Sequence, residues 1–225
     1  MTFDSRRHED TLTPFLTPLI RCYAKRSWWP GESAFEIAAS AVLVQNTAWS
    51  NAEKAIESLR QRGALEATNI LQLSSCELES LIRSSGTFRV KAKRLVELAR
   101  WWAAHARAGL NDASTYAESL RQVSGIGPET ADAIAVFVFR EASFIADAYA
   151  LRILTRAGFL NQRISYQQAQ SWIHERLSLT PDLARDIHAA LVEHAKVTCK
   201  KVPKCETCIV RRDCEHGRQR YRAGD

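Results

Sequence analysis

The sequence predicts an all-α fold of about ten helices joined by short loops. Apolar residues recur at helical spacing along nearly all of the 225 residues, and convincing strand alternation is absent. No repeat of fixed period is present. The 9 glycines and 6 prolines are scattered, and 46% of the residues are hydrophobic, so the chain can bury a sizeable core. This length suits one large domain or two small ones.

Seven segments carry an apolar face at helical spacing. In chain order they are residues 51–60, 91–102, 115–123, 128–139, 148–154, 165–177 and 181–195. In 91–102, for example, Leu95, Ala99 and Trp102 lie on one face. Ser165 and Thr180 directly precede the last two segments and are suited to cap them. The sequence therefore predicts helices at these places.

The positive charge is concentrated near the end of the sequence. The formal net charge is +6, and residues 196–225 hold nine Lys or Arg and four Asp or Glu. This distribution indicates an anionic partner, most often nucleic acid, although a solvated basic tail is the alternative. No window contains the roughly 18 apolar residues that a membrane span needs. The first residues carry no apolar signal region, so we expect a cytoplasmic, nucleoid-associated protein with no membrane partner.

Four of the six cysteines are crowded together, which indicates a metal site in a cytosolic chain. They are spaced Cys199-x5-Cys205-x2-Cys208-x5-Cys214. Thiolates are soft ligands that select zinc or an iron–sulfur cluster, and the spacing leaves both open. Cys22 and Cys76 lie far from this group, and we expect them to be small buried side chains.

The stretch SGIGP, residues 124–128, connects two predicted helices. Gly125 and Gly127 permit backbone angles that side chains forbid, and they expose backbone N–H groups. At the start of a helix such groups suit a phosphate oxygen, which favours a DNA-backbone site. The alternative is an ordinary helix–turn–helix connection.

Asp147 follows an apolar run that we expect to be a short extended link, residues 142–147. Its position before the helix at 148–154 predicts an N-cap, worth about 1 kcal/mol. A carboxylate at a cleft edge can also stabilise a cationic transition state and orient a water. The two roles are compatible.

Together these motifs resemble the endonuclease III branch of the helix-hairpin-helix (HhH-GPD) DNA glycosylases. The segments VSGIGPETA, ADAYALRIL and EHAKVTCKKVPKCETCIVRRDC have that family's order and spacing, and FEIAASAVLVQNTAWSNAEKAI is similar to its first core helices. The resemblance covers residues 28–214. It implies a six-helix domain at 27–141 that carries the hairpin, and a second domain formed by 1–26 and 142–225. A damaged base would enter the cleft between them, with Asp147 at its rim.

The resemblance also implies a cofactor and DNA contacts. The four cysteines would hold a structural 4Fe-4S cluster and not zinc, although this chain has five residues between the first two ligands where the family usually has six. Gln45 would fill the gap that a flipped nucleotide leaves, and Phe88 would be a wedge or a core aromatic. The hairpin would contact DNA through Gly125, Ile126, Gly127, Glu129 and Thr130. The expected partner is duplex DNA that contains a damaged base, bound by a monomer.

Glu129 departs from part of the family in a way that changes the expected chemistry. Members that also cut the strand have a lysine there, whose amine forms a Schiff base with the sugar. A carboxylate cannot form an imine, so the resemblance implies a monofunctional glycosylase. Lys196 or Lys200 could offer another amine, but the sequence places neither at the sugar.

Two adjacent tryptophans raise the question of the substrate. Trp28, Trp29 and Pro30, together with Trp49, either form a stacking wall for a flipped base or fix a domain junction. The stretch is similar to the 3-methyladenine glycosylase members of the family, which favours an alkylated purine. The alternatives are a glycosylase for uracil, mismatched thymine or an oxidised pyrimidine, and a DNA-binding protein without catalysis.

Overall fold

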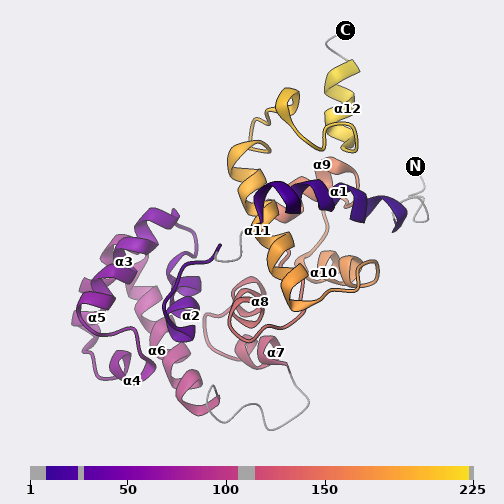
Figure 1. Cartoon of the computed structure of the whole chain (residues 1–225). Coiled ribbons are helices and arrows are strands. Elements are labelled where there is room, and N and C mark those ends of the chain that lie inside the picture. The colour runs from indigo at the N-terminus through magenta and orange to yellow at the C-terminus, as the bar shows by residue number, and fades with distance from the viewer. Residues whose placement is uncertain (1–8, 25–27, 106–114, 223–225) are drawn as a thin grey trace. The chain divides into compact units, whose positions relative to one another are not determined.

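The computed structural model describes residues 9–24, 28–105 and 115–222. Every regular element among these residues is a helix, as Figure 1 shows, so the all-α prediction is confirmed. The chain divides into two compact units. We call Trp29–Glu141 the hairpin unit, and Met1–Trp28 with Ala142–Asp225 the cysteine unit. In the part of the chain that the structure describes, no helix has the length and apolarity that crossing a bilayer requires.

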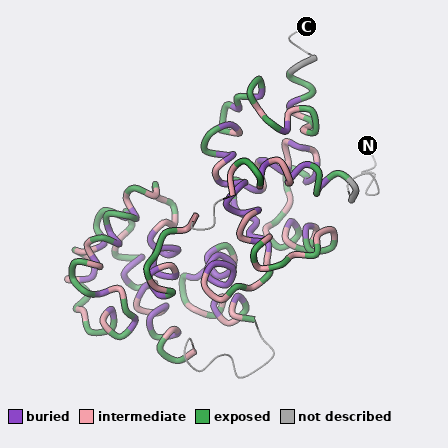
Figure 2. Tube along the Cα trace, viewed as in Figure 1, coloured by how far each residue is buried: buried purple, intermediate pink, exposed green. Residues whose placement is uncertain are grey.

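In the hairpin unit, helix α8 packs against α2 and α7 and is buried along almost its whole length (Figure 2). Helices α2, α6 and α7 contribute to the core of this unit through residues such as Leu43, Leu95 and Leu120. Arg121 joins α7 to α8, because its Nη2 lies 2.9 and 3.0 Å from the two carboxylate oxygens of the buried Asp132. The helices are α2 (Ala34–Leu43), α3 (Trp49–Gln61), α4 (Ala67–Ile70), α5 (Ser75–Leu81), η2 (Arg83–Ser85), α6 (Phe88–His105), α7 (Tyr116–Arg121) and α8 (Pro128–Phe137).

The cysteine unit joins segments from both ends of the chain. Helix α1 lies along α11, and Leu12, Phe15 and Leu19 of α1 are buried in a core that includes Ile187 and Leu191 of α11. Figure 1 shows these two helices side by side. The helices are α1 (Glu9–Tyr23), α9 (Ala148–Ala157), α10 (Tyr166–His174), α11 (Pro181–Val197), η3 (Cys205–Thr207) and α12 (Glu215–Arg222).

Helix starts in the cysteine unit follow the predicted capping. Ser165 forms a capping box at α10, and the Thr180 side chain accepts a hydrogen bond from the Leu183 amide at α11. Residues 142–147 contain no helix or strand, which agrees with the expected extended link. These side chains therefore determine where the last long helices begin.

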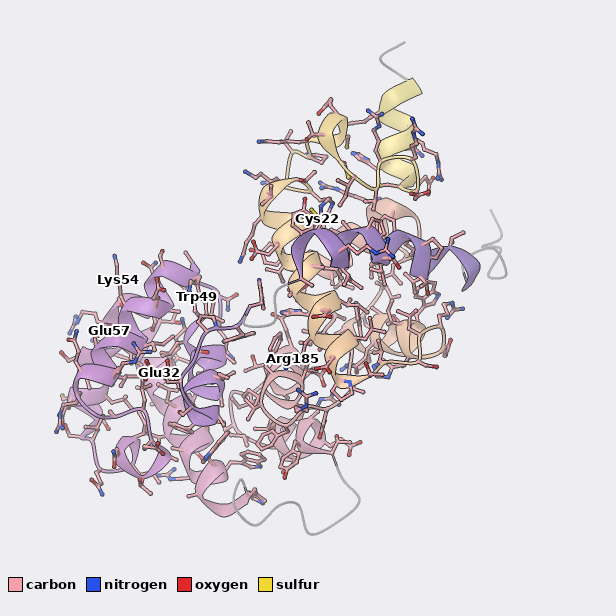
Figure 3. All side chains as sticks on the ribbon, viewed as in Figure 1. Cys22, Glu32, Trp49, Lys54, Glu57 and Arg185 are labelled. Carbon is pink, nitrogen blue, oxygen red and sulfur yellow. The ribbon has the colours of Figure 1, made fainter. Side chains whose placement is uncertain are left out.

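The two isolated cysteines contradict the expectation of burial, since both are exposed. Cys22 lies in the last turn of α1 (Figure 3), on a surface that it shares with Thr17 and Arg21. Cys76 lies in the first turn of α5, a short helix whose buried residue is Leu78. Each cysteine falls on the solvent face of its helix, which a small hydrophobic side chain tolerates.

Candidate functional site

Asp147 ends the extended link of the cysteine unit and begins α9. Its Oδ1 accepts a hydrogen bond from the Ala150 amide at 2.7 Å, which confirms the predicted N-cap. The residue is only 6% exposed. A carboxylate is thus held in one orientation, with one oxygen used by the helix.

The burial of Asp147 changes its acidity. Removal from water raises the pKa of the carboxyl to about 6, against the amide N–H groups of Ala150 and Tyr149 and the charges of Arg152 and Lys196, which lower it. The group is therefore mostly ionised at neutral pH and protonated in mild acid. A carboxylate with this pKa can serve as a base or as a stabilising anion near physiological pH.

Trp28, also in the cysteine unit, contacts three side chains of α11. Its Nε1 donates a hydrogen bond to Glu193 Oε1 at 2.9 Å, and its ring meets His188 edge-on at 5.3 Å between centroids. Lys196 lies over the ring with Nζ 5.6 Å from the centroid, and it also forms an ion pair with Glu193 at 3.1 Å. Lys196 also lowers the pKa of Asp147 slightly, so its charge acts on both residues of the cysteine unit.

His188 supplies a neutral side chain to this site. It is buried, and burial followed by repulsion from Lys196 lowers its pKa to about 3. The imidazole is consequently uncharged at any physiological pH.

Trp29 and Trp49 lie together in the hairpin unit. Trp29 Nε1 donates to Ser40 Oγ at 2.7 Å, and its ring lies 4.9 Å from Phe137 and 6.3 Å, edge-on, from Trp49. Trp49 begins α3 and is half-buried (Figure 3). Pro30 is exposed beside them. Of the four residues expected at the base pocket, Trp29 and Trp49 are therefore in contact with each other, and Trp28 contacts α11 instead.

The hairpin glycines differ from each other. Gly125 has φ +84°, a conformation that favours glycine, as predicted. Gly127 has φ −81° and ψ 172°, which any residue adopts, so the prediction of special backbone angles is wrong there. A Cβ at Gly127 would meet no described atom within 4 Å, so the space beside it is open. Ile126 is 4% exposed and its amide donates to Val123 O, so its side chain anchors the turn in the core.

The remaining hairpin and wedge candidates have different environments. Thr130 is buried and its Oγ1 accepts a hydrogen bond from Gln45 Nε2 at 2.8 Å. Glu129 is exposed in the first turn of α8. Phe88 begins α6, packs against the core of the hairpin unit and has the guanidinium of Arg83 5.0 Å from its ring centroid. Their roles toward DNA stay predictions.

The four clustered cysteines line one cavity. Arg156 Nη1 lies 3.3 Å from Cys199 Sγ, and His194 Nε2 lies 3.8 Å from Cys208 Sγ. His216 lines the same cavity, and its buried Nε2 has no hydrogen-bond partner among the described residues. The cavity therefore offers four soft ligands together with hydrogen-bond donors.

The thiols do not surround a single point. Among the residues that the structure describes, no three His, Cys, Asp or Glu side chains converge closely enough to bind one metal ion. Burial raises the pKa of Cys208 to about 11 in the metal-free chain, so metal binding would have to displace its proton.

Three charged residues that lie near Gln45 or Trp28 were not predicted as site residues. Arg94 donates a hydrogen bond to Gln45 Oε1, and Lys91, one turn earlier in α6, is 1% exposed. Lys196 was considered only as a spare amine. In the sequence the sole signal is a lysine and an arginine within the apolar helix 91–102, beside Ala92 and Leu95.

Comparisons with known proteins identify a family. The model of the HhH-GPD superfamily base excision DNA repair proteins matches residues 39–178. A protein of Methanocaldococcus jannaschii that is named a DNA repair glycosylase is 32% identical over 202 residues, which are 87% of this chain and 92% of that protein. Endonuclease III of Thermotoga maritima is 29% identical over 189 residues, 83% of this chain and 84% of the relative.

Solved structures show the same fold. An endonuclease III in a non-covalent DNA complex superposes with a TM-score of 0.81 at 19% identity, covering 95% of this chain and 98% of its own. A 3-methyladenine DNA glycosylase of H. pylori bound to 1,N6-ethenoadenine gives 0.70 at 24% identity, with 86% and 98% covered. A thermostable thymine-DNA glycosylase gives 0.75 at 17% identity, with 96% and 100% covered.

Proposed function

Because the chain belongs to the HhH-GPD superfamily of base excision DNA repair proteins, we propose that it is a monofunctional DNA glycosylase for alkylated purines. Family membership supports a DNA glycosylase of base excision repair. The finer proposal is that the enzyme flips a damaged nucleotide out of duplex DNA and hydrolyses its N-glycosidic bond. Asp147 is the single residue whose geometry carries this proposal.

Asp147 is suited to assist the loss of a base. As the glycosidic bond breaks, positive charge develops on the sugar, and a buried carboxylate stabilises that charge more strongly than one in water. The Ala150 amide fixes the side chain at the helix start, so no reorientation is needed during the reaction. The ionised group can then accept a proton from the water that attacks the sugar.

Glu129 supports hydrolysis without strand cutting. It is exposed in the first turn of α8, where the resemblance places the lysine of strand-cutting members. A carboxylate there cannot form a Schiff base, and it is electrostatically suited to a helix start. Water would complete the reaction and leave an intact abasic strand.

The hairpin supports contact with the DNA backbone. Backbone angles and packing against the described residues leave the space beside Gly127 open, and a phosphate oxygen could approach the backbone there. Such a contact would fix the duplex without selecting its sequence.

The tryptophans support an alkylated purine as the substrate. N3- and N7-alkylated purines are cationic, so their glycosidic bond is already weak, and they stack on indole faces with a gain of about 0.5–2 kcal/mol. The structural relative from H. pylori is a 3-methyladenine DNA glycosylase that was solved with a modified adenine. We propose that Trp49, Trp28, Trp29 and Pro30 contribute to the base pocket.

One observation favours a second candidate, a glycosylase for mismatched thymine or uracil. Lys196 lies over the Trp28 ring, where a cationic base would be repelled and a neutral pyrimidine would not. A thymine-DNA glycosylase is also among the structural relatives. The choice between cationic and neutral bases therefore depends on which tryptophan face receives the base.

We propose that Cys199, Cys205, Cys208 and Cys214 hold a 4Fe-4S cluster. Their shared cavity, the Arg156 guanidinium beside Cys199 and the buried His216 Nε2 fit a thiolate-bound anionic group. When bound, such a cluster would order the loop between α11 and α12.

The experiment is a panel of duplexes that each contain one lesion: 3-methyladenine, 1,N6-ethenoadenine, uracil or a thymine mismatch. We expect release of 3-methyladenine, strand breakage only after alkali, and no covalent complex on borohydride treatment. Faster release of uracil or thymine would favour the second candidate. A strong borohydride-trapped band would contradict the monofunctional mechanism and identify Lys196 or Lys200 as the first amines to test.

A further inference from the structure

Gln45 lies in a turn that two other segments of the hairpin unit hold in place. Helix α2 ends at Leu43, and Asn46 has φ +52°, so the chain turns sharply around Gln45. The half-buried side chain uses both ends of its amide, since Nε2 donates to Thr130 Oγ1 at 2.8 Å and Oε1 accepts from Arg94 Nη1. The Gln45 side chain is therefore fixed before any DNA is present.

Arg94 connects this turn to the hairpin. A Cβ placed on Gly125 would lie 2.8 Å from Arg94 Nε and 3.0 Å from Arg94 Cδ. The arginine side chain thus occupies the space beside the Gly125 backbone while its guanidinium binds Gln45. A single side chain joins the two segments that are proposed to act on the duplex.

Lys91 holds the surrounding backbone in place. Its Nζ donates to Leu43 O at 2.8 Å and to Ser85 O at 2.5 Å, and the residue is 1% exposed. Burial, with a smaller effect of Arg94, lowers its pKa. Because an ammonium this deeply buried is unfavourable unless it is hydrogen-bonded, the two carbonyls and α6 are held together. Lys91 therefore fixes the main chain, and Arg94 fixes the side chain.

We propose that Arg94 is a positioning residue that orients Gln45 for insertion into the gap left by the flipped nucleotide. The inference rests on the proposed function and on the predicted role of Gln45, which is to fill that gap. Preorganisation of this kind lowers the entropy lost when the side chain is ordered on the DNA. Arg94 acts through Gln45 and not through a phosphate of its own.

The first arm of the test uses the free protein and needs no activity. In a 15N-labelled sample, the Gln45 side-chain amide, assigned with Gln45→Ala, should be restricted in motion and protected from exchange. Arg94→Met, which keeps the packing beside Gly125, should clearly increase the motion of that amide, because Oε1 loses its partner while Nε2 keeps the hydrogen bond to Thr130. Arg100→Met is the matched control, because Arg100 lies on the same helix, is exposed and pairs with Glu97. Unchanged Gln45 signals in Arg94→Met would overturn the proposal.

The second arm uses lesion duplexes in single-turnover kinetics. We expect Arg94→Met and Gln45→Ala each to slow base release about tenfold, and the double variant to be no slower than Gln45→Ala alone. The salt dependence of duplex binding should not change, whereas loss of a phosphate contact would lower its slope by about one. Additive effects, a lowered slope or faster release in Arg94→Met would each overturn the proposal.

Arg94→Lys serves as the second variant, because it keeps the charge and the stem beside Gly125 but replaces the planar guanidinium that binds Gln45 with a freely rotating ammonium. It should behave as Arg94→Met does in both arms. If the wild-type protein releases no base from any duplex, the proposed function fails while the first arm still decides whether Arg94 orients Gln45. The two failures are therefore distinguishable.

Discussion

Asp147 is both a helix cap and a buried charge. Substitution by asparagine distinguishes these two roles. Asn keeps the acceptor for the Ala150 amide and loses the negative charge. We expect Asp147→Asn to bind lesion duplex within about twofold of wild type and to release base at least a hundredfold more slowly, about 3 kcal/mol in barrier. Single-turnover assays from pH 5 to 8 check this. In the wild type the rate should rise with pH, be half-maximal near pH 6 and level off as the carboxyl becomes fully ionised.

The same substitution should stabilise the fold. The pKa of Asp147 is raised from 3.8 to about 6, so the folded state binds more protons than the unfolded state between these values. Its contribution to stability is therefore present below about pH 4 and is lost as pH rises through 6. At pH 7.5 Asp147→Asn should raise the free energy of unfolding by about 1–3 kcal/mol, measured in urea, and at pH 4 it should change little. Asp182→Asn, at the exposed start of α11, is the control; an equal gain at both pH values would contradict the assignment.

At the scale of the element, the two hairpin glycines should respond differently to substitution. Gly125→Ala introduces a side chain at φ +84° against Arg94, and we expect a loss of about 1–2 kcal/mol in unfolding free energy. Gly127→Thr keeps a good N-cap at ordinary backbone angles, so its stability should stay within about 0.5 kcal/mol. Its affinity for undamaged duplex should nevertheless fall at least fivefold, because the side chain fills the space proposed for phosphate. Thermal melts and fluorescence anisotropy measure the two quantities; unchanged affinity in Gly127→Thr would remove the hairpin from the DNA interface.

The sequence predicts the elements whose signals are local. Ser165, Thr180 and Asp147 lie next to the amides that they cap, so their roles can be inferred from neighbouring residues. Helices α4, α5 and α12 were not predicted, because α4 and α5 are too short to show a clear helical period and α12 is too polar to show an apolar face. The prediction for Gly127 failed because the residue type alone does not show whether a glycine adopts unusual backbone angles or only leaves the space beside it open.

Only those candidate site residues that lie within a sequence motif could be predicted from the sequence. Asp147 and the cysteines are identified by their neighbours in sequence, and the structure places the four thiols around one cavity. The Arg94–Gln45 bond joins residues 49 positions apart, and the Trp28–Glu193 bond joins residues 165 positions apart. Such contacts depend on which helices pack together. The hydrophobic period shows which face of a helix is buried, but it does not show which helix covers that face.

At the scale of the whole molecule, the stability of the cysteine unit should depend on the proposed 4Fe-4S cluster. Protein purified without oxygen should be brown and contain about four irons and four sulfides per chain. Cys205→Ala should lose most of the iron and much of the stability of the cysteine unit, because metal binding and folding are coupled. Cys76→Ala, at an exposed site in the hairpin unit, should keep both. Iron and zinc analysis with thermal melts checks this, and stoichiometric zinc without iron would contradict it.

The discontinuity of the cysteine unit has a consequence for synthesis on the ribosome. The hairpin unit is one continuous segment and can fold as soon as it has emerged. Helix α1 precedes its partner α11 by more than 150 residues, which corresponds to roughly 10–30 s of translation. During that interval Leu12, Phe15, Leu16 and Leu19 have no core to enter. The nascent chain therefore carries an uncovered apolar stripe, and we expect it to be a chaperone substrate until the segment that bears the cysteines has been made.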